Sequence, residues 1–228
     1  MMQENSMEKA KAQVLQAALG HVAFDGWSEI SLAAAIADSG VEPGLARALY
    51  PRGGVDLAVA YHRAGDAAMV EALAARDLAS LRFRDRVSLA IRLRLAAADK
   101  ELVRRGSALF ALPQHAFEGA RLIWSTADAI WTALGDTSRD LNWYSKRTSL
   151  SAVYAATVLY WLGDTSEGDE ATWAFLDRRI ENVMQFEKVK TGLQKNQGLQ
   201  TLLKGPMKVL ERISAPNGRD ELPGKMKG

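Results

Sequence analysis

Apolar residues recur at steps of three and four along most of the chain, and no stretch alternates apolar and polar residues over the length of a strand. The first pattern is typical of amphipathic α-helices, and the second would indicate half-buried strands. The sequence therefore predicts an all-α fold. Breaks rich in Gly, Pro, Ser and Asp separate the expected helices, which cover residues 7–23, 27–38, 43–50, 55–80, 84–104, 114–134, 138–162 and 168–189.

The amino-acid composition changes at Lys190, where a polar run is followed by one apolar segment and an end rich in Pro, Gly and Lys. Polar runs of this kind are typical of linkers. We therefore expect three parts. They are a helix-turn-helix-like head over 1–54, a helical body over 55–189, and a flexible linker with an amphipathic helix over 190–228.

The first three expected helices have the spacing of a helix-turn-helix, with the turn at residues 37–41. Gly40 ends the second helix, Gly44 and Tyr50 follow four and ten residues later, and residues 51–54 close the short third helix. This head resembles that of the tetracycline-repressor family. The resemblance implies that a helical ligand-binding and dimerisation body follows the head. It also keeps open a transcriptional regulator of that type with a hydrophobic ligand.

The charge of the head is unfavourable for DNA binding. Residues 1–80 hold six basic and ten acidic side chains, although the whole chain has a formal charge of +2. The expected recognition helix offers one cation, Arg47, among apolar residues. Duplex binding depends largely on neutralising phosphates, and apolar side chains cannot read base edges by hydrogen bonding. We therefore expect no DNA binding.

Sequence motifs for catalysis, metals and cofactors are missing. The chain has no cysteine, and it lacks Gly-rich phosphate loops, serine-nucleophile elbows and paired-histidine zinc motifs. None of His21, His62 and His115 has a glutamate three residues before it, as helical di-iron enzymes require. We interpret each histidine as a helix-surface or satisfied core residue. We expect no enzyme, and no cofactor, metal site or catalytic residue.

Residues 136–147 read Asp-Thr-Ser-Arg-Asp-Leu-Asn-Trp-Tyr-Ser-Lys-Arg and are the most informative stretch. Together with the Pro-containing segment 111–113 and the segment 172–184, they resemble the ubiquinone (coenzyme Q) biosynthesis accessory family, the lipid-binding Coq-nine proteins. The resemblance covers about residues 10–215 and is strongest over 105–186.

This resemblance implies a repressor-like fold that has lost DNA binding, in non-enzymatic homodimers that bind isoprenoid or quinone lipid in the body. It implies that quinone intermediates are presented to the demethoxyubiquinone hydroxylase. The matching partner-binding patch comprises Leu141, Asn142, Trp143 and Tyr144, and helical spacing adds Arg147. An exposed Trp-Tyr pair rimmed by charge also has the composition of an interface hot spot.

A carrier of a polyprenyl chain needs a long apolar pocket, which the resemblance also implies. Large apolar side chains of the body could form its wall or could be ordinary core packing, and helical spacing leaves both interpretations open. The candidate lipid-binding residues are Trp124, Ile130, Trp131, Leu134, Leu150, Tyr154 and Trp161.

The tail is basic, because residues 188–228 hold nine basic and three acidic side chains. A basic amphipathic segment suits a helix that lies on a membrane surface, although the same helix could pack back on the body. The expected membrane-binding residues are Leu199, Leu202, Leu203, Lys204, Met207, Lys208, Leu210 and Ile213.

The start of the sequence lacks the basic end and apolar run of a secretory signal and is too acidic for a transit peptide. No apolar stretch reaches the roughly 20 residues that span a bilayer. We therefore expect a cytoplasmic protein that is peripherally associated with the inner membrane.

Overall fold

The computed structural model describes residues 2–139 and 141–194. Within these ranges every regular element is helical, so the prediction of an all-α fold is confirmed. The elements are α1 (Met2–Asp25), α2 (Glu29–Ser39), α3 (Pro43–Leu49), α4 (Gly54–Ala74), α5 (Phe83–Ala96), α6 (Lys100–Phe110), α7 (Ala116–Ala133), α8 (Leu141–Gly163), the short 3₁₀ helix η1 (Glu167–Asp169) and α9 (Glu170–Gln194).

Local sequence signals place the helix-turn-helix of the head. The Ser28 hydroxyl accepts the N–H of Ser31 at the start of α2, which satisfies one of the unpaired amides of a helix N-terminus. Gly40 ends α2 with φ of 67°, a left-handed conformation that favours glycine. Glu42 then caps α3, where its carboxylate accepts two backbone N–H groups. The predicted turn therefore forms where the sequence places it.

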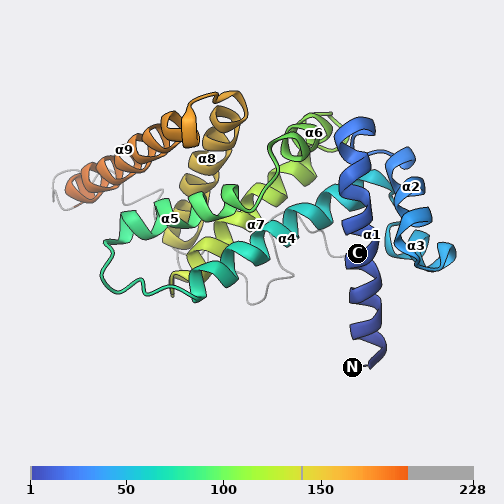
Figure 1. The fold of residues 1–228 in the computed structure, drawn as a ribbon. Coiled ribbons are helices and arrows are strands. Elements are labelled where there is room, and N and C mark those ends of the chain that lie inside the picture. Colours follow the sequence, from blue (N-terminus) through green and yellow to red (C-terminus); the bar gives the residue numbers. More distant parts are fainter. Residues whose placement is uncertain (1, 140, 195–228) are drawn as a thin grey trace.

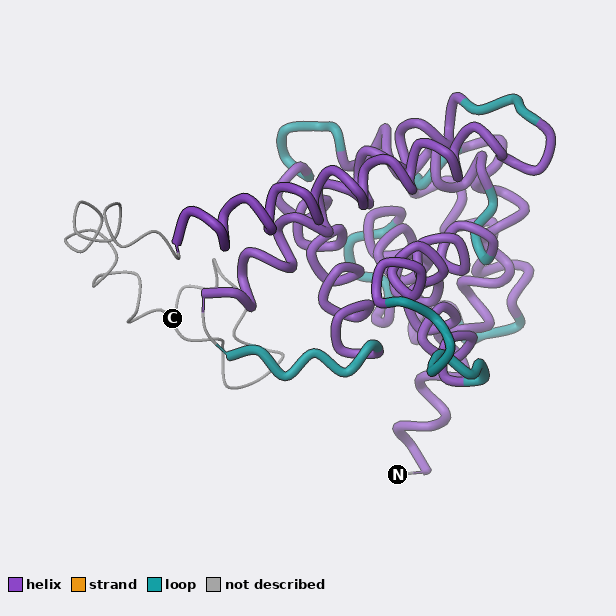
Figure 2. Tube along the Cα trace, turned by 90° about the vertical axis from the view of Figure 1, so that its left-hand side faces the viewer, coloured by secondary structure: helices purple, strands orange, loops and turns teal. Residues whose placement is uncertain are grey.

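The head and the far end of the body lie at opposite ends of the molecule (Figure 1), with α4 and α7 running between them. α4 packs against α5 and α7, and α8 packs against α7 and α9. Figure 2 shows α9 running along one edge of the molecule to the end of the described chain, while the first turns of α1 project away from the other helices.

Two clusters of buried apolar side chains hold these helices together. The head cluster centres on Val14, Leu32 and Tyr50 and also takes in Leu57 of α4 and Leu102 of α6. The body cluster is built from α4, α5, α7, α8 and α9. Because α4 contributes to both clusters, it couples the head to the body. The division at residue 54 stays a prediction.

Several helix boundaries differ from the expectation. The predicted helix 84–104 is two helices, because the Asp99 carboxylate caps α6 by accepting the N–H groups of Glu101 and Leu102. α4 ends at Ala74 rather than near 80. Residues 190–194, predicted as linker, continue α9. Among the described residues, no helix has the length and apolar character needed to cross a lipid bilayer.

Candidate lipid cavity and partner surface

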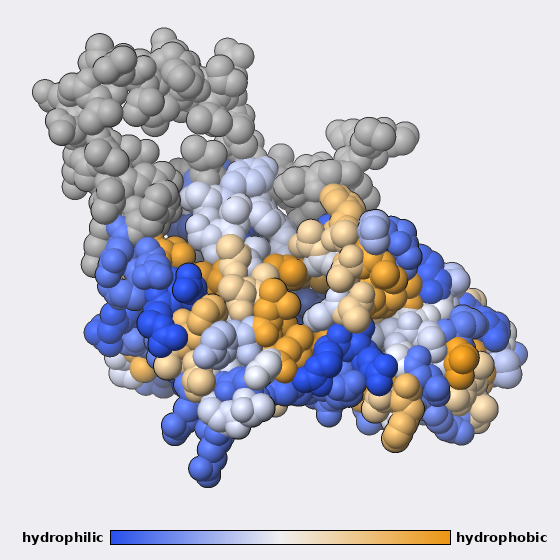
Figure 3. All heavy atoms as spheres, turned by 90° about the horizontal axis from the view of Figure 1, so that it is seen from above, coloured by the Kyte–Doolittle hydropathy of each residue, from blue (hydrophilic) through white to orange (hydrophobic). Residues whose placement is uncertain are grey.

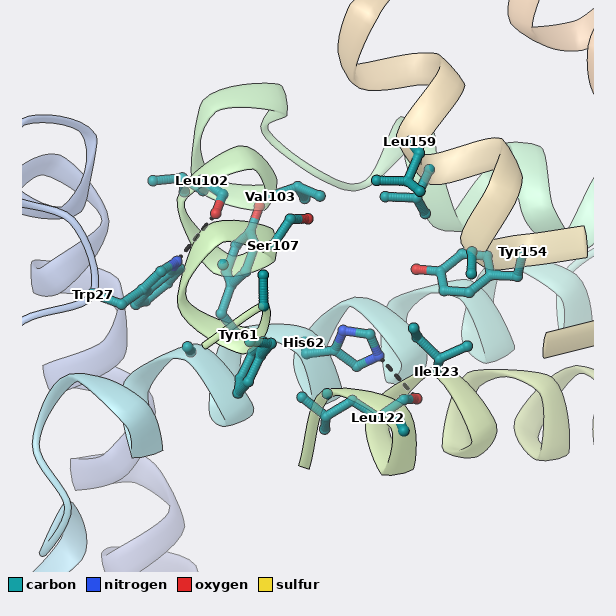
Figure 4. Close-up of a pocket in the computed structure, with 18 of the residues that line it drawn as sticks. Trp27, Tyr61, His62, Leu102, Val103, Ser107, Leu122, Ile123, Tyr154 and Leu159 are labelled. Carbon is teal, nitrogen blue, oxygen red and sulfur yellow. Dashed lines mark hydrogen bonds between the residues drawn. The ribbon is translucent and has the colours of Figure 1, made fainter. Parts of the chain in front are cut away.

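An apolar cavity of about 380 Å³ lies between α4, α6, α7 and α8 (Figure 4). Seen from above, hydrophobic side chains gather near the middle of the visible face of the molecule (Figure 3). Leu159 both lines the cavity and is 68% exposed, so the cavity opens to the surface at α8. Large apolar side chains of the wall are Trp27, Tyr61, Leu95, Leu102, Val103, Phe110, Leu122, Ile123, Tyr154, Val158 and Leu159.

Small residues on the facing helices leave the space open. Ala58 on α4, Gly106 on α6, Ala120 on α7 and Ala155 on α8 all line the cavity. Larger side chains at these positions would fill it, because helices pack at distances set by the side chains between them. The volume lies within the range of small-molecule sites, roughly 300 to 1,000 Å³.

A buried ion pair lies at the inner end of the cavity. Arg94 is 3% exposed and donates through Nε to Asp66 Oδ1 at 2.7 Å. Its second terminal nitrogen donates to the carbonyl of His62 at 3.0 Å, and the Thr126 hydroxyl also donates to Asp66 Oδ1 at 2.9 Å. Buried charges require such pairing, because an unpaired one is costly. The cavity is therefore apolar along its length and polar at one end.

Two titratable side chains at this end stay neutral near pH 7. Burial lowers the pKa of His62 to about 4, against the attraction of Asp66. Burial also raises the pKa of Tyr154, so its phenol keeps its proton. The cavity thus offers neutral hydrogen-bonding groups to a ligand rather than a free charge, since the guanidinium of Arg94 is paired with Asp66.

The predicted lipid-binding residues divide between two cavities and the core. Tyr154 lines the first cavity. Trp131, Leu134 and Leu150 line a second cavity of about 560 Å³ between α5, α8, α9 and the loop after α7. Three further predicted residues line neither cavity. They are Trp124, Ile130 and Trp161.

Packing explains why those three lie outside the cavities. Ile130 is fully buried and Trp161 is 4% exposed, where its indole donates to Asp169 at 2.9 Å. Trp124 packs against the rings of Trp143 and Tyr144. The interpretation as core therefore fits Ile130 and Trp161 better than the interpretation as a pocket wall.

Most of the first cavity was not predicted from the sequence. Tyr61, His62 and Arg94 come from α4 and α5, far in sequence from the predicted residues. One signal was present, because His62 and Asp66 are one helical turn apart and share a helix face with the apolar residues Ala58, Met69 and Leu73. Such a pair is more polar than a core helix face requires.

The predicted partner-binding residues begin α8. Trp143 and Tyr144 are half-buried rather than fully exposed, and their rings meet edge to face at 4.8 Å. Asn142 is exposed. For Leu141 the structure describes the backbone position in α8 but not the side chain. The tail residues from Leu199 to Ile213 lie outside the described residues.

Arg147 has a structural position that the sequence analysis did not anticipate. It is 2% exposed, donates to Asp128 at 2.6 Å and to Asp136 at 3.0 Å, and lies over the Trp143 ring at 4.1 Å. It therefore joins α7, the following loop and α8 from inside, and its contribution to the patch is to hold Trp143 in place.

Comparison with known proteins shows which family this part of the chain resembles. Residues 116–187, which carry the patch and much of both cavity walls, match the COQ9 family model. Over this segment the chain is therefore similar to the COQ9 family. It is 29% identical to the ubiquinone biosynthesis protein COQ9, mitochondrial, of Drosophila melanogaster, covering 79% of this chain and 57% of that protein.

Two further COQ9 relatives agree with this assignment. The human protein of the same name is 29% identical over 79% of this chain and 59% of its own length. A probable ubiquinone biosynthesis protein coq9, mitochondrial, of Dictyostelium discoideum is 27% identical over 83% of this chain and 64% of its own length. The chain thus spans only about three fifths of the length of these curated COQ9 relatives. The predicted resemblance to this family is confirmed.

The fold of this chain also matches that of a transcriptional regulator. A TetR transcriptional regulator from Nitrosomonas europaea superposes with a TM-score of 0.60 at 19% identity, over 75% of this chain and 95% of that chain. This likeness confirms the predicted tetracycline-repressor-like fold and carries no statement about function.

The predicted cytoplasmic localisation was wrong. These COQ9 relatives are all named as mitochondrial proteins. The prediction rested on the first residues of the chain, and those residues carry little information when the chain spans only part of its relatives' length.

Proposed function

We propose that this protein is a non-enzymatic accessory protein of ubiquinone biosynthesis that binds isoprenoid quinone intermediates in the cavity between α4, α6, α7 and α8. The observation that carries the proposal is the shape of that cavity, which is apolar along its wall, polar at its inner end and open beside Leu159. A polyprenylated ring has matching chemistry. Its polar ring suits the inner end, and its hydrocarbon chain suits the wall and the opening.

Lipid extraction tests this carrier function. We expect organic extracts of the purified protein to contain a prenylated ring compound when analysed by mass spectrometry. Ala155→Phe should remove it, because the larger side chain fills the cavity. Ala152→Phe is the matched control, because Ala152 is an exposed residue of the same helix and should leave the lipid content unchanged. Absence of lipid from the unaltered protein would overturn the proposal.

The charges on the head support a function that does not involve DNA binding. Arg47, the one cation of α3, is paired with Glu29 at 2.6 Å, and the carboxylate of Glu42 lies at the start of the same helix. This surface offers little positive charge to phosphates. In a gel-shift assay at moderate salt we expect no specific retardation of duplex DNA. Tight salt-resistant binding would instead favour the transcriptional regulator.

We further propose that the surface around Asn142, Trp143 and Tyr144 binds the demethoxyubiquinone hydroxylase. Trp143 is half-buried between Arg147 and Trp124, and such anchored aromatic residues often dominate interfaces. Trp143→Ala is the suitable change, because a lysine would lie against Arg147. Trp173→Ala is the matched control, because Trp173 is also half-buried beneath an arginine, Arg92.

In a pull-down with the hydroxylase, Trp143→Ala should reduce recovery by roughly tenfold or more, as for a hot-spot residue. Trp173→Ala should retain it. Equal recovery of both variants, with unchanged helicity by circular dichroism, would refute this surface as the binding site.

We also propose that the protein is a homodimer and that the basic amphipathic tail of each chain binds a membrane surface. Two basic amphipathic tails would bind a surface more tightly than one, because the second binding event is intramolecular. A chain that ends at Gln194 should lose sedimentation with anionic liposomes and keep the helicity of the body. Retained sedimentation would exclude the tail as the membrane contact.

A further inference from the structure

One ring nitrogen of His62 points into the wall of the first cavity, and the other points toward the interior of the cavity. Nε2 lies 2.8 Å from Thr126 Oγ1, 3.2 Å from the carbonyl of Leu122 and 3.6 Å from Asp66 Oδ2. Figure 4 shows the other ring nitrogen, Nδ1, on the side away from Leu122, where it faces the space bounded by Ser107 and Tyr154. Among the described residues Nδ1 has no hydrogen-bond partner.

The neighbours of Nε2 decide where the ring proton lies. The Thr126 hydroxyl has a single hydrogen, which it donates to Asp66 Oδ1 at 2.9 Å or to the Leu122 carbonyl at 3.2 Å. When the hydrogen goes to either of these acceptors, the Thr126 oxygen accepts from His62 Nε2. The carbonyl of Leu122 and the carboxylate of Asp66 can only accept. Nε2 consequently carries the proton.

A neutral imidazole has one protonated nitrogen, so Nδ1 is an acceptor. The ring stays neutral because it is buried and lies near Arg94. Asp66 Oδ2 is buried without a hydrogen-bond partner among the described residues, and it faces the Nε2 side of the ring. The carboxylate thus favours the same tautomer. His62 presents a lone pair, and no hydrogen, to the cavity.

We propose that this cavity selects ligands with a ring hydroxyl, so that it takes a prenylated phenol or hydroquinone in preference to the oxidised quinone. A ring hydroxyl donates to His62 Nδ1. A quinone carbonyl has no hydrogen to donate. Its oxygen and His62 Nδ1 are both acceptors, so Nδ1 would stay unpaired in an apolar space. This inference rests on the proposed carrier function.

The other polar groups of the wall do not discriminate in this way. The hydroxyls of Tyr154 and Ser107 face the same space in Figure 4, and each can donate or accept. They can therefore bind either oxidation state. His62 is the specificity-determining residue because its tautomer is imposed by Thr126, Leu122 and Asp66.

Binding to the full chain tests this selectivity without relying on a redox couple. The probes are a farnesylated phenol, its methyl ether and the corresponding farnesylated benzoquinone, titrated by quenching of tryptophan fluorescence, since Trp27 lines the cavity. We expect the phenol to bind roughly tenfold more tightly than the ether or the quinone, as for one unpaired buried acceptor.

Two variants assign the preference to His62. His62→Phe removes the acceptor, and His62→Gln can turn its amide to donate or accept, so in both the three dissociation constants should agree within about twofold. Tyr154→Phe should weaken binding yet keep the preference. Either His62 variant suffices if the other does not fold by circular dichroism.

The outcomes separate the two proposals. Equal binding of all three probes by the unaltered protein would overturn the selectivity and leave the carrier function standing. A preference that survives in the folded His62 variants would also overturn it. Failure of every probe to bind would instead refute the proposed carrier function.

Discussion

Gly54 lies where the first turn of α4 meets the backbone before α2. A Cβ at this position would lie 2.3 Å from the carbonyl carbon and oxygen of Trp27 and 2.4 Å from the N of Ser28. These are backbone atoms and cannot move aside as the end of a side chain can. Gly20 lies on the exposed side of α1, where an added Cβ would meet no atom of a neighbouring group within 4 Å. The two glycines therefore differ in their role.

We expect Gly54→Ala to lower the free energy of unfolding by roughly 3 kcal/mol, because it forces α4 away from the α1–α2 turn. Gly20→Ala should raise the free energy of unfolding by roughly 0.5 to 1 kcal/mol, because alanine favours a helix interior over glycine. Urea unfolding followed by circular dichroism measures both. A Gly54→Ala variant with unchanged stability would contradict the close approach of Gly54 to the backbone of Trp27 and Ser28.

The loop between α7 and α8 is held by one acidic side chain. The side chain of Asp136 is 4% exposed and accepts hydrogen bonds from Lys146 at 2.7 Å, from Ser138 at 2.8 Å and from Arg147 at 3.0 Å. Burial alone would raise the pKa of Asp136, but these hydrogen bonds outweigh it and lower the pKa to about 2. Asp136 therefore positions the start of α8, where Trp143 lies.

The lowered pKa of Asp136 predicts a pH dependence of stability. In the unfolded chain Asp136 titrates near its ordinary value of 3.8, so its stabilisation is complete above that pH and is lost as the pH falls through 2. The difference is worth roughly 2 kcal/mol.

The variant Asp136→Asn isolates this contribution. At pH 5 it should be less stable than the unaltered protein by roughly 2 kcal/mol, and at pH 3 this deficit should fall to about half. Urea unfolding at both pH values gives the comparison. A deficit that does not change with pH would show that the charge of Asp136 is not the cause.

The first cavity joins the head to the body at the scale of the whole molecule. Trp27 belongs to the head core, lines the cavity and donates from its indole to the carbonyl of Leu102 in α6 at 3.1 Å. Arg52 beside α4 pairs with Glu118 of α7 at 2.6 Å. A ligand in the cavity therefore contacts elements of both cores.

Ligand binding should consequently stabilise head and body together. At a free farnesylated phenol concentration of 100 times Kd, we expect the free energy of unfolding to rise by about 2.7 kcal/mol. Hydrogen exchange of α2 amides should slow along with that of α7 amides. Ala155→Phe should show neither effect. Protection confined to α7 and α8 would mean that the head is not coupled to the cavity.

Local signals in the sequence determined much of this protein. Helical periodicity, the Ser28 and Glu42 caps and the left-handed turn at Gly40 act between residues close in the chain, so the helices and the helix-turn-helix follow from them. The break at Asp99 was overlooked because an uninterrupted apolar pattern outweighed a capping residue that was present. The family resemblance likewise lay in a contiguous segment.

Only the tertiary structure decided which apolar faces are core and which surround a space. Ile130 and Tyr154 both repeat at helical spacing, yet one is packed on all sides and the other borders a cavity. Helical periodicity shows that a side chain points inward and not what it meets there. The tautomer of His62 depends on Thr126 and Leu122, about 60 residues away, because α4 and α7 bring them together.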